Sequence, residues 1–251
     1  MTQLKYKEAL KESFSFYINN FRNIFFIYLI LFISSIPLYY TKIEFYRNLE
    51  YFLTYLFLSI IVFIIFYTFT RLTIYFYYEE EKIILKSIKK SIKNYFPFLL
   101  TYLITLIAIF ASIIISLFIS IFISIPFFII SMQLSEIIYI TSFIIFSLLL
   151  IILFNKIFFS PMIVIFKKKS IYNSLYESWK NIKIRDSALI LLYNLLIDSI
   201  LIITYMLQIY YNNFAFSLLN SFISSEFVTP IGNLFSIILY KQYSKKIKLF
   251  F

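Results

Sequence analysis

Three polar residues lie deep inside apolar segments of the sequence and are its strongest candidates for chemistry. Lys156 lies about ten residues before the end of one apolar segment, and Asp198 lies about ten residues into the next. At 1.5 Å of rise per residue, both are about 15 Å deep in a membrane-spanning helix. Asn194 lies one helical turn before Asp198 on the same face. Ionisable groups at that depth are costly, and they mark ion pathways, proton relays or charge pairs.

Lys156 and Asp198 are predicted to form an ion pair, because their segments run in opposite directions and are joined by a single connector. In a transporter, Asp198 would bind a cation or proton and Lys156 would be the resting counter-charge. As a structural pair, the two charges would instead fix the register of two helices, and this is the favoured interpretation. Arg71 lies closer to the end of its segment, about 10 Å from the end, so we expect it to snorkel to the surface.

Composition defines the class of protein that carries these residues. The chain has 251 residues, of which 62% are hydrophobic and 14% charged, with a mean hydropathy of +0.89. Soluble domains carry roughly 25% charged and 45–50% apolar residues, so this composition indicates an integral membrane protein. The sequence has no histidine, no cysteine and one glycine. It therefore lacks the usual general base, cysteine metal ligands and a glycine-rich phosphate loop, and we expect no enzyme activity, metal or cofactor.

The predicted fold is all-α, with six membrane-spanning helices, each needing about 20 apolar residues. Their predicted limits are Phe21–Tyr40, Tyr51–Tyr78, Phe98–Phe122, Ile137–Phe166, Ser187–Ile209 and about Phe222–Tyr240. The fourth is interrupted by Lys156 and Pro161 near its end, and the sixth has Glu226 at its outer interface.

The uncharged stretch from Asn94 to Ser135 is about 60 Å long as one helix, twice the hydrocarbon thickness, so we expect a break at Ser124-Ile125-Pro126. It holds either one span followed by a surface segment, or two short spans in a hairpin. The hairpin would place the Lys167–Lys169 cluster outside the cell, so a single span is favoured.

Charge distribution predicts the topology. With six spans, 19 of the 23 lysines and arginines lie on one side, and Lys42 and Arg47 lie on the other. The positive-inside rule then places both termini in the cytoplasm of a cell-membrane protein.

Three short charged segments precede spans and share one residue frame. Ser174–Asn181 aligns without gaps with Ser87–Asn94, and Ala9–Phe14 fits the same pattern. They divide a single domain, residues 1–251, into parallel repeats of about 4–78, 82–166 and 169–248. Each repeat would consist of one amphipathic helix and two spans.

Lysines in these segments are predicted to bind the headgroups of anionic lipids on the inner leaflet. They are Lys86, Lys89, Lys90, Lys93, Lys167, Lys168 and Lys169. The second segment alternates apolar residues with lysines at helical spacing, which is typical of a helix in the membrane surface. An ordinary solvated helix packed on its neighbours is the alternative. The +11 charge surrounds apolar spans, so nucleic acid is not an expected partner.

The stretch Ser174-Leu175-Tyr176-Glu177-Ser178-Trp179-Lys180, preceded by Phe158-Phe159-Ser160-Pro161 and followed by a span, carries a family resemblance. It resembles six-span membrane-domain proteins related to the segment fused to some glycerophosphodiester phosphodiesterases. The resemblance implies roles in membrane integrity or export. It implies no phosphodiesterase activity, since that catalytic domain is a separate soluble barrel.

The sequence therefore predicts a non-catalytic multi-pass membrane protein that acts as a scaffold or membrane-integrity factor. A small transporter or channel component using Asp198 and Lys156 is the first alternative. A membrane anchor for a cytoplasmic or membrane protein partner is the second.

Overall fold

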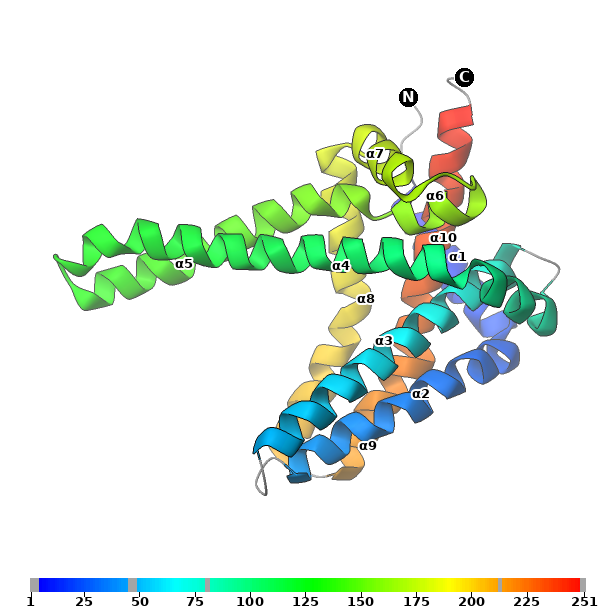
Figure 1. Ribbon diagram of the computed structural model, residues 1–251, viewed down its shortest axis with the longest axis horizontal. Coiled ribbons are helices and arrows are strands. Elements are labelled where there is room, and N and C mark those ends of the chain that lie inside the picture. The colour runs from blue at the N-terminus through cyan, green and yellow to red at the C-terminus, as the bar shows by residue number, and fades with distance from the viewer. Residues whose placement is uncertain (1–4, 45–48, 80–81, 212–213, 249–251) are drawn as a thin grey trace. The chain divides into compact units, whose positions relative to one another are not determined.

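The computed structural model describes the backbone of residues 5–44, 49–79, 82–211 and 214–248, and every element in these ranges is helical (Figure 1). The longer helices are α1 (Tyr6–Asn19), α2 (Phe21–Glu44), α3 (Leu49–Glu79), α4 (Ile84–Phe128), α5 (Met132–Phe154), α8 (Ile184–Tyr211) and α10 (Thr229–Lys248). The shorter ones are η1 (Asn155–Ile157), α6 (Ser160–Phe166), α7 (Ile171–Asn181), α9 (Phe214–Ile223) and η2 (Ser224–Val228). The all-α prediction is confirmed.

The chain forms two compact units. The first comprises Met1–Phe96 with Leu192–Phe251, and the second comprises Pro97–Leu191. Helices α4 and α8 pass from one unit to the other. The limits of these units differ from those of the three predicted repeats, which stay a prediction.

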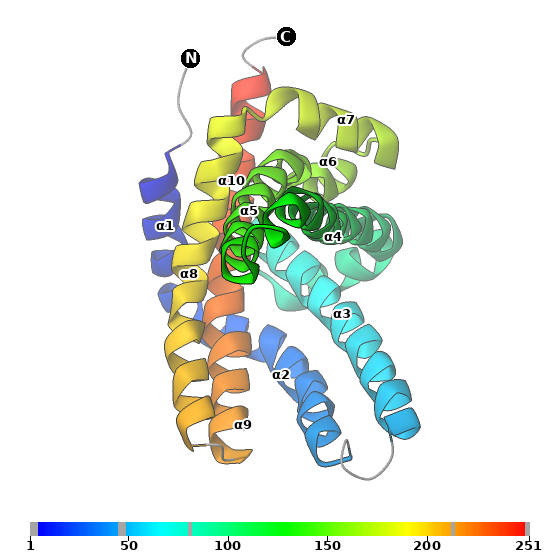
Figure 2. The same cartoon turned by 90° about the vertical axis from the view of Figure 1, so that its left-hand side faces the viewer.

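In the first unit, α2 and α3 lie side by side, and α10 packs against both α3 and α1 (Figure 2). Helix α1 meets α2 at an angle of 92°. It runs antiparallel along α10, because the Lys5 backbone N–H donates to Gln242 Oε1 at 2.8 Å while the Tyr17 hydroxyl donates to the Glu226 carbonyl at 2.7 Å. The first predicted amphipathic helix is thus packed lengthwise on the last span.

In the second unit, α4 and α5 are the two arms of a long hairpin, joined by a short turn (Figures 1 and 2). One face of α4 is a buried seam of small polar residues at helical spacing: Thr101, Thr105, Ser112, Ser116, Ser120 and Ser124. The Ser135 hydroxyl donates to the Ser124 carbonyl at 3.0 Å, which places this end of the seam against α5. Most of α6 is buried, and α7 packs on it.

Four described helices are long and apolar enough to cross a membrane, and the bent pair α1–α2 gives a fifth if it counts as one span. The predicted second span lies within α3, the third within α4 and the fourth within α5–α6. The fifth predicted span lies within α8. In much of the C-terminal half of α8 the structure describes only the backbone. The predicted interruption of the fourth span is confirmed, because α5 ends at Phe154 and α6 begins at Ser160, with Pro161 in its first turn.

The predicted break at Ser124–Pro126 is wrong. Helix α4 continues for 45 residues to Phe128, with Pro97 and Pro126 inside it. The prediction counted length alone, whereas the amphipathic stretch and the following span form one uninterrupted helix. A proline inside a helix frees the carbonyl four residues earlier, which is that of Lys93 for Pro97 and that of Phe122 for Pro126, and membrane helices tolerate this when neighbouring groups satisfy that carbonyl.

Glu226, the residue predicted at the outer interface of the sixth span, is fully buried. The helix that carries it begins at Phe214, because the apolar stretch Phe214–Ile223 forms α9 and runs through η2 into α10. Glu226 is therefore an interior residue of this helical segment, level with Tyr17 at the end of α1.

The three aligned charged segments bury the same positions. Ala9 and Ser13 in α1, Ser87 and Ser91 in α4, and Ser174 and Ser178 in α7 all have 0% exposed surface. Small side chains permit the close approach of two helices. Large apolar side chains of the same segments, such as Phe14 and Ile92, are exposed. Each segment therefore turns its small residues toward the protein.

Replacing a buried small residue should loosen this packing. We expect Ser13→Leu to overpack the contact between α1 and α10 and to lower stability by roughly 1–3 kcal/mol. Ser15→Leu, two residues away on the exposed face of α1, is the matched control and should stay within roughly 0.5 kcal/mol. Thermal unfolding of the detergent-solubilised protein measures both. Equal shifts in melting temperature would contradict the assignment of the packed face.

Candidate functional site

Lys156 lies in η1 and is half-buried between α5 and α6. Its Nζ is 4.6 Å from the centre of the Trp179 ring, a cation–π distance. Its backbone carbonyl accepts a hydrogen bond of 2.7 Å from the Ser178 hydroxyl. The turn that carries Lys156 therefore binds α7 through two adjacent side chains, Ser178 and Trp179.

Asp198 lies on an exposed face of α8, and Asn194 is half-buried one turn before it. Asp198 belongs to the first unit and Lys156 to the second. The predicted ion pair between them thus concerns two separate units and stays a prediction.

Substitution to neutral residues tests this pair. If the pair is structural, Asp198→Asn and Lys156→Met each lower the melting temperature, and the double variant loses less than the sum, with a coupling of roughly 0.5–3 kcal/mol. Lys156→Arg, which keeps the charge, is the control. The transport hypothesis makes a different prediction: normal stability of the double variant and loss of proton or alkali-cation flux into proteoliposomes.

Arg71 does not snorkel to the surface as expected. It is 8% exposed in α3, and its Nε donates to the Tyr75 hydroxyl one turn later at 2.5 Å. Its guanidinium carbon also lies 5.6 Å from the centre of that ring. The tyrosine provides a hydrogen-bond acceptor and an aromatic face inside the helix packing, which the spacing of charges in the sequence does not reveal.

A polar contact between α2 and α10 lies nearby in the same unit. The Asn233 amide donates to the Tyr28 hydroxyl at 2.7 Å, and both residues are buried. Ser236, one turn along α10, is a hydrogen-bonding partner of Tyr75. Polar groups inside helix bundles act as interhelical contacts. Sequence reasoning missed this group because only its arginine carries a charge.

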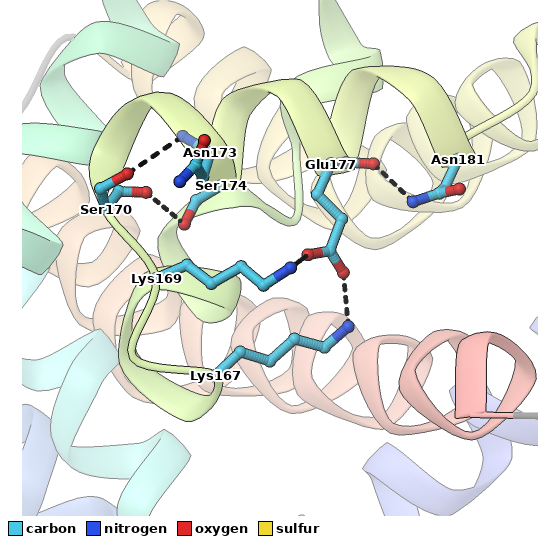
Figure 3. A network of polar contacts seen from close by, with 7 residues as sticks. All are labelled: Lys167, Lys169, Ser170, Asn173, Ser174, Glu177 and Asn181. Carbon is cyan, nitrogen blue, oxygen red and sulfur yellow. Dashed lines mark hydrogen bonds and ion pairs between the residues drawn. The ribbon is translucent and has the colours of Figure 1, made fainter. Parts of the chain in front are cut away.

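Glu177 of α7 is the centre of a charged cluster in the second unit (Figure 3). It forms ion pairs with Lys167 and with Lys169, the latter at 2.6 Å. The helix is capped by Ser170, whose hydroxyl accepts from the Asn173 backbone N–H and whose carbonyl accepts from the Ser174 hydroxyl. Two of the three lysines of the Lys167–Lys169 cluster, all predicted to bind headgroups, are thus engaged within the protein.

The charge state of Glu177 depends on these lysines. Burial alone would raise the pKa of its carboxyl group, but hydrogen bonds from Lys167 and Lys169 outweigh burial and hold the pKa below its ordinary value of 4.5. A lowered pKa in the folded state contributes stability that is fully present above about pH 4.5 and is lost as pH falls through the lowered value.

Neutralising Glu177 should loosen α7. We expect Glu177→Gln to cost about 1–2 kcal/mol, less than a fully buried pair because Lys169 is half-exposed. The protection of the Ile171–Asn181 amides against hydrogen exchange, relative to the intrinsic rate at each pH, should fall in the variant, and in the wild type as pH falls below about 4.5. Glu136→Gln, at an exposed carboxylate, is the control. Unchanged protection of α7 in Glu177→Gln would contradict a stabilising role for the cluster.

The first stretch of α4 has an exposed face with two parallel strips. Leu85, Ile92 and Phe96 are 80%, 66% and 68% exposed and form an apolar strip. At about 100° per residue, the predicted lipid-binding Lys89 and Lys93 lie directly beside it. Lys86 borders the same basic strip, whereas Lys90 is half-buried toward the inner face. An apolar strip flanked by lysines is the arrangement of a helix at a membrane surface.

Helix α1 carries a similar exposed face. Phe14 and Ile18 are exposed on it, and Lys7 and Lys11 lie alongside. Both faces point away from the buried Ala9–Ser13 and Ser87–Ser91 positions, because those lie on the opposite side of each helix.

The described part of the chain is therefore all-helical, and several of its helices are long and apolar enough to cross a membrane. The sequence matches no protein-family model, and neither a curated protein nor a solved structure matches it.

Proposed function

We propose that the protein is a non-catalytic, multi-pass scaffold of the cell membrane whose basic helix faces bind the anionic inner leaflet. The observation that carries this proposal is the exposed face of α4, where Leu85, Ile92 and Phe96 lie beside Lys89 and Lys93. The apolar strip would enter the acyl-chain region while the lysines stay at the level of the headgroups.

The apolar strip and the lysines contribute different amounts to the free energy of binding to the membrane. Full burial of a leucine, isoleucine or phenylalanine side chain in an apolar environment stabilises by about 1.5–3 kcal/mol. A lysine near an anionic surface contributes about 1 kcal/mol. The apolar strip therefore supplies most of the affinity, and the lysines supply the preference for anionic lipid. On this basis Lys89 and Lys93 are the principal headgroup ligands, rather than Lys167 and Lys169, which are paired with Glu177.

The proposal includes the six-span topology with cytoplasmic termini, which places the exposed face of the first stretch of α4 at the inner leaflet. The burial of small residues at matching positions of α1, α4 and α7 supports three parallel repeats. The proposal also holds that the chain is related to the six-span membrane-domain proteins that resemble the segment fused to some glycerophosphodiester phosphodiesterases.

The chain has no cysteine, so a single fluorescent label at Ile92→Cys reports on this face alone. The labelled protein is placed in nanodiscs of phosphatidylcholine, with or without phosphatidylglycerol, that contain a lipid-borne quencher. We expect strong quenching in the anionic discs and, after Lys89→Gln and Lys93→Gln, a loss of the difference between the two lipids.

Lys89→Arg with Lys93→Arg is the matched control, since it preserves charge and should preserve the lipid preference. A label that stays in water in both lipids would refute the proposal. So would quenching that ignores lipid charge in the wild type.

A further inference from the structure

Glu226 is a fully buried carboxylate in the first unit, with 0% exposed surface. Neither of its carboxylate oxygens accepts a hydrogen bond from the residues that the structure describes. It lies in η2, a single turn of π-helix between α9 and α10. Such turns inside α-helices often occur at functional sites.

Glu226 is followed by Phe227, whose ring packs among other aromatic rings. The Phe227 ring lies 6.1 Å from that of Tyr17, 6.2 Å from that of Phe21 and 6.1 Å from that of Phe222. The Tyr17 hydroxyl reaches Glu226, but it donates to the backbone carbonyl rather than to the carboxylate. The Tyr17 hydroxyl is therefore already engaged with the backbone.

Few charges are available to stabilise an ionised Glu226. Helix α1 contributes Tyr17, and α2 contributes Arg22, which is exposed. Helix α9 contains no ionisable residue, and the first charged residue of α10 is Lys241, about four turns away. An ionised carboxylate without a partner in an apolar interior is strongly disfavoured, whereas the neutral acid is compatible with it.

We infer that Glu226 is a proton-binding site: in the packed state its carboxylate takes one proton from the aqueous phase and is a neutral carboxylic acid. No cavity or second ligand is needed, because the proton adds no volume. When the contact of α1 with η2 opens, water reaches the carboxyl group and the proton is released. The packing of α1 on η2 and α10 is therefore tightest when Glu226 is protonated. This site is independent of the proposed binding to lipid.

Stability at different pH values tests the inference. The folded state retains a proton that the unfolded chain releases above about pH 4.3, so stability should fall as pH rises. For one proton the unfolding equilibrium shifts about tenfold per pH unit. The chain has no histidine, so between about pH 5 and 8 no other side chain titrates in its ordinary range. Glu226→Gln, which resembles the neutral acid, should remove this slope, whereas Glu136→Gln should keep it.

Infrared spectroscopy provides a measurement that does not require a variant to fold. In wild-type protein labelled with ¹³C-glutamate and held in nanodiscs at neutral pH, we expect the C=O stretch of one protonated glutamate. Where Glu226→Gln folds, that band should be absent from it and present in Glu136→Gln. A spectrum with only ionised glutamates at neutral pH, or a wild type with the same pH slope as Glu226→Gln, would overturn the inference.

Discussion

Close helix packing in this chain depends on serine and threonine side chains whose hydroxyls donate hydrogen bonds to carbonyls of their own helix. A buried hydroxyl without a partner is costly in an apolar environment. Here the Ser13 hydroxyl donates to the Ala9 carbonyl one turn earlier, and Ser91 donates to Ser87 in the same way. Their burial therefore needs no partner on a neighbouring helix. With one glycine in 251 residues, the chain relies on such side chains wherever two backbones must approach.

Polar groups that cannot satisfy themselves are paired between elements. Asn233 reaches Tyr28 across two helices, and Lys167 and Lys169 converge on Glu177. In the charged cluster, the favourable lysine contacts exceed the penalty of burying the carboxylate. Each of these contacts holds a helix in one position against its neighbour, which contact between apolar surfaces alone would not determine. For α7 this matters most, because its outward side is polar and aromatic, with Tyr172 and Tyr176 exposed.

Much of the fold follows from the sequence, because apolar length and charge spacing are strong signals. The helical class, the limits of α3 and the interruption near Lys156 are confirmed. The unbroken α4 was missed because the length of the uncharged stretch was taken as the limit of one helix, whereas the helix begins ten residues before that stretch and continues past Pro126 to Phe128. The buried position of Arg71 depends on Tyr75, and that of Glu226 on Tyr17 and α9. Tyr75 is only one turn from Arg71, and the arginine was misplaced because the prediction considered depth alone; the contact of Tyr17 with Glu226 joins distant segments and has no local signal.

The seam on α4 repeats every four residues, with Ser112, Ser116, Ser120 and Ser124 in line. The Ser116 and Ser120 hydroxyls each bond the carbonyl one turn back in their own helix. Sliding α4 by one turn, about 6 Å, would bring each serine onto the place of its neighbour without breaking those bonds. The seam therefore presents nearly the same surface from one turn to the next, and the Ser135–Ser124 hydrogen bond next to the turn marks its end toward α5.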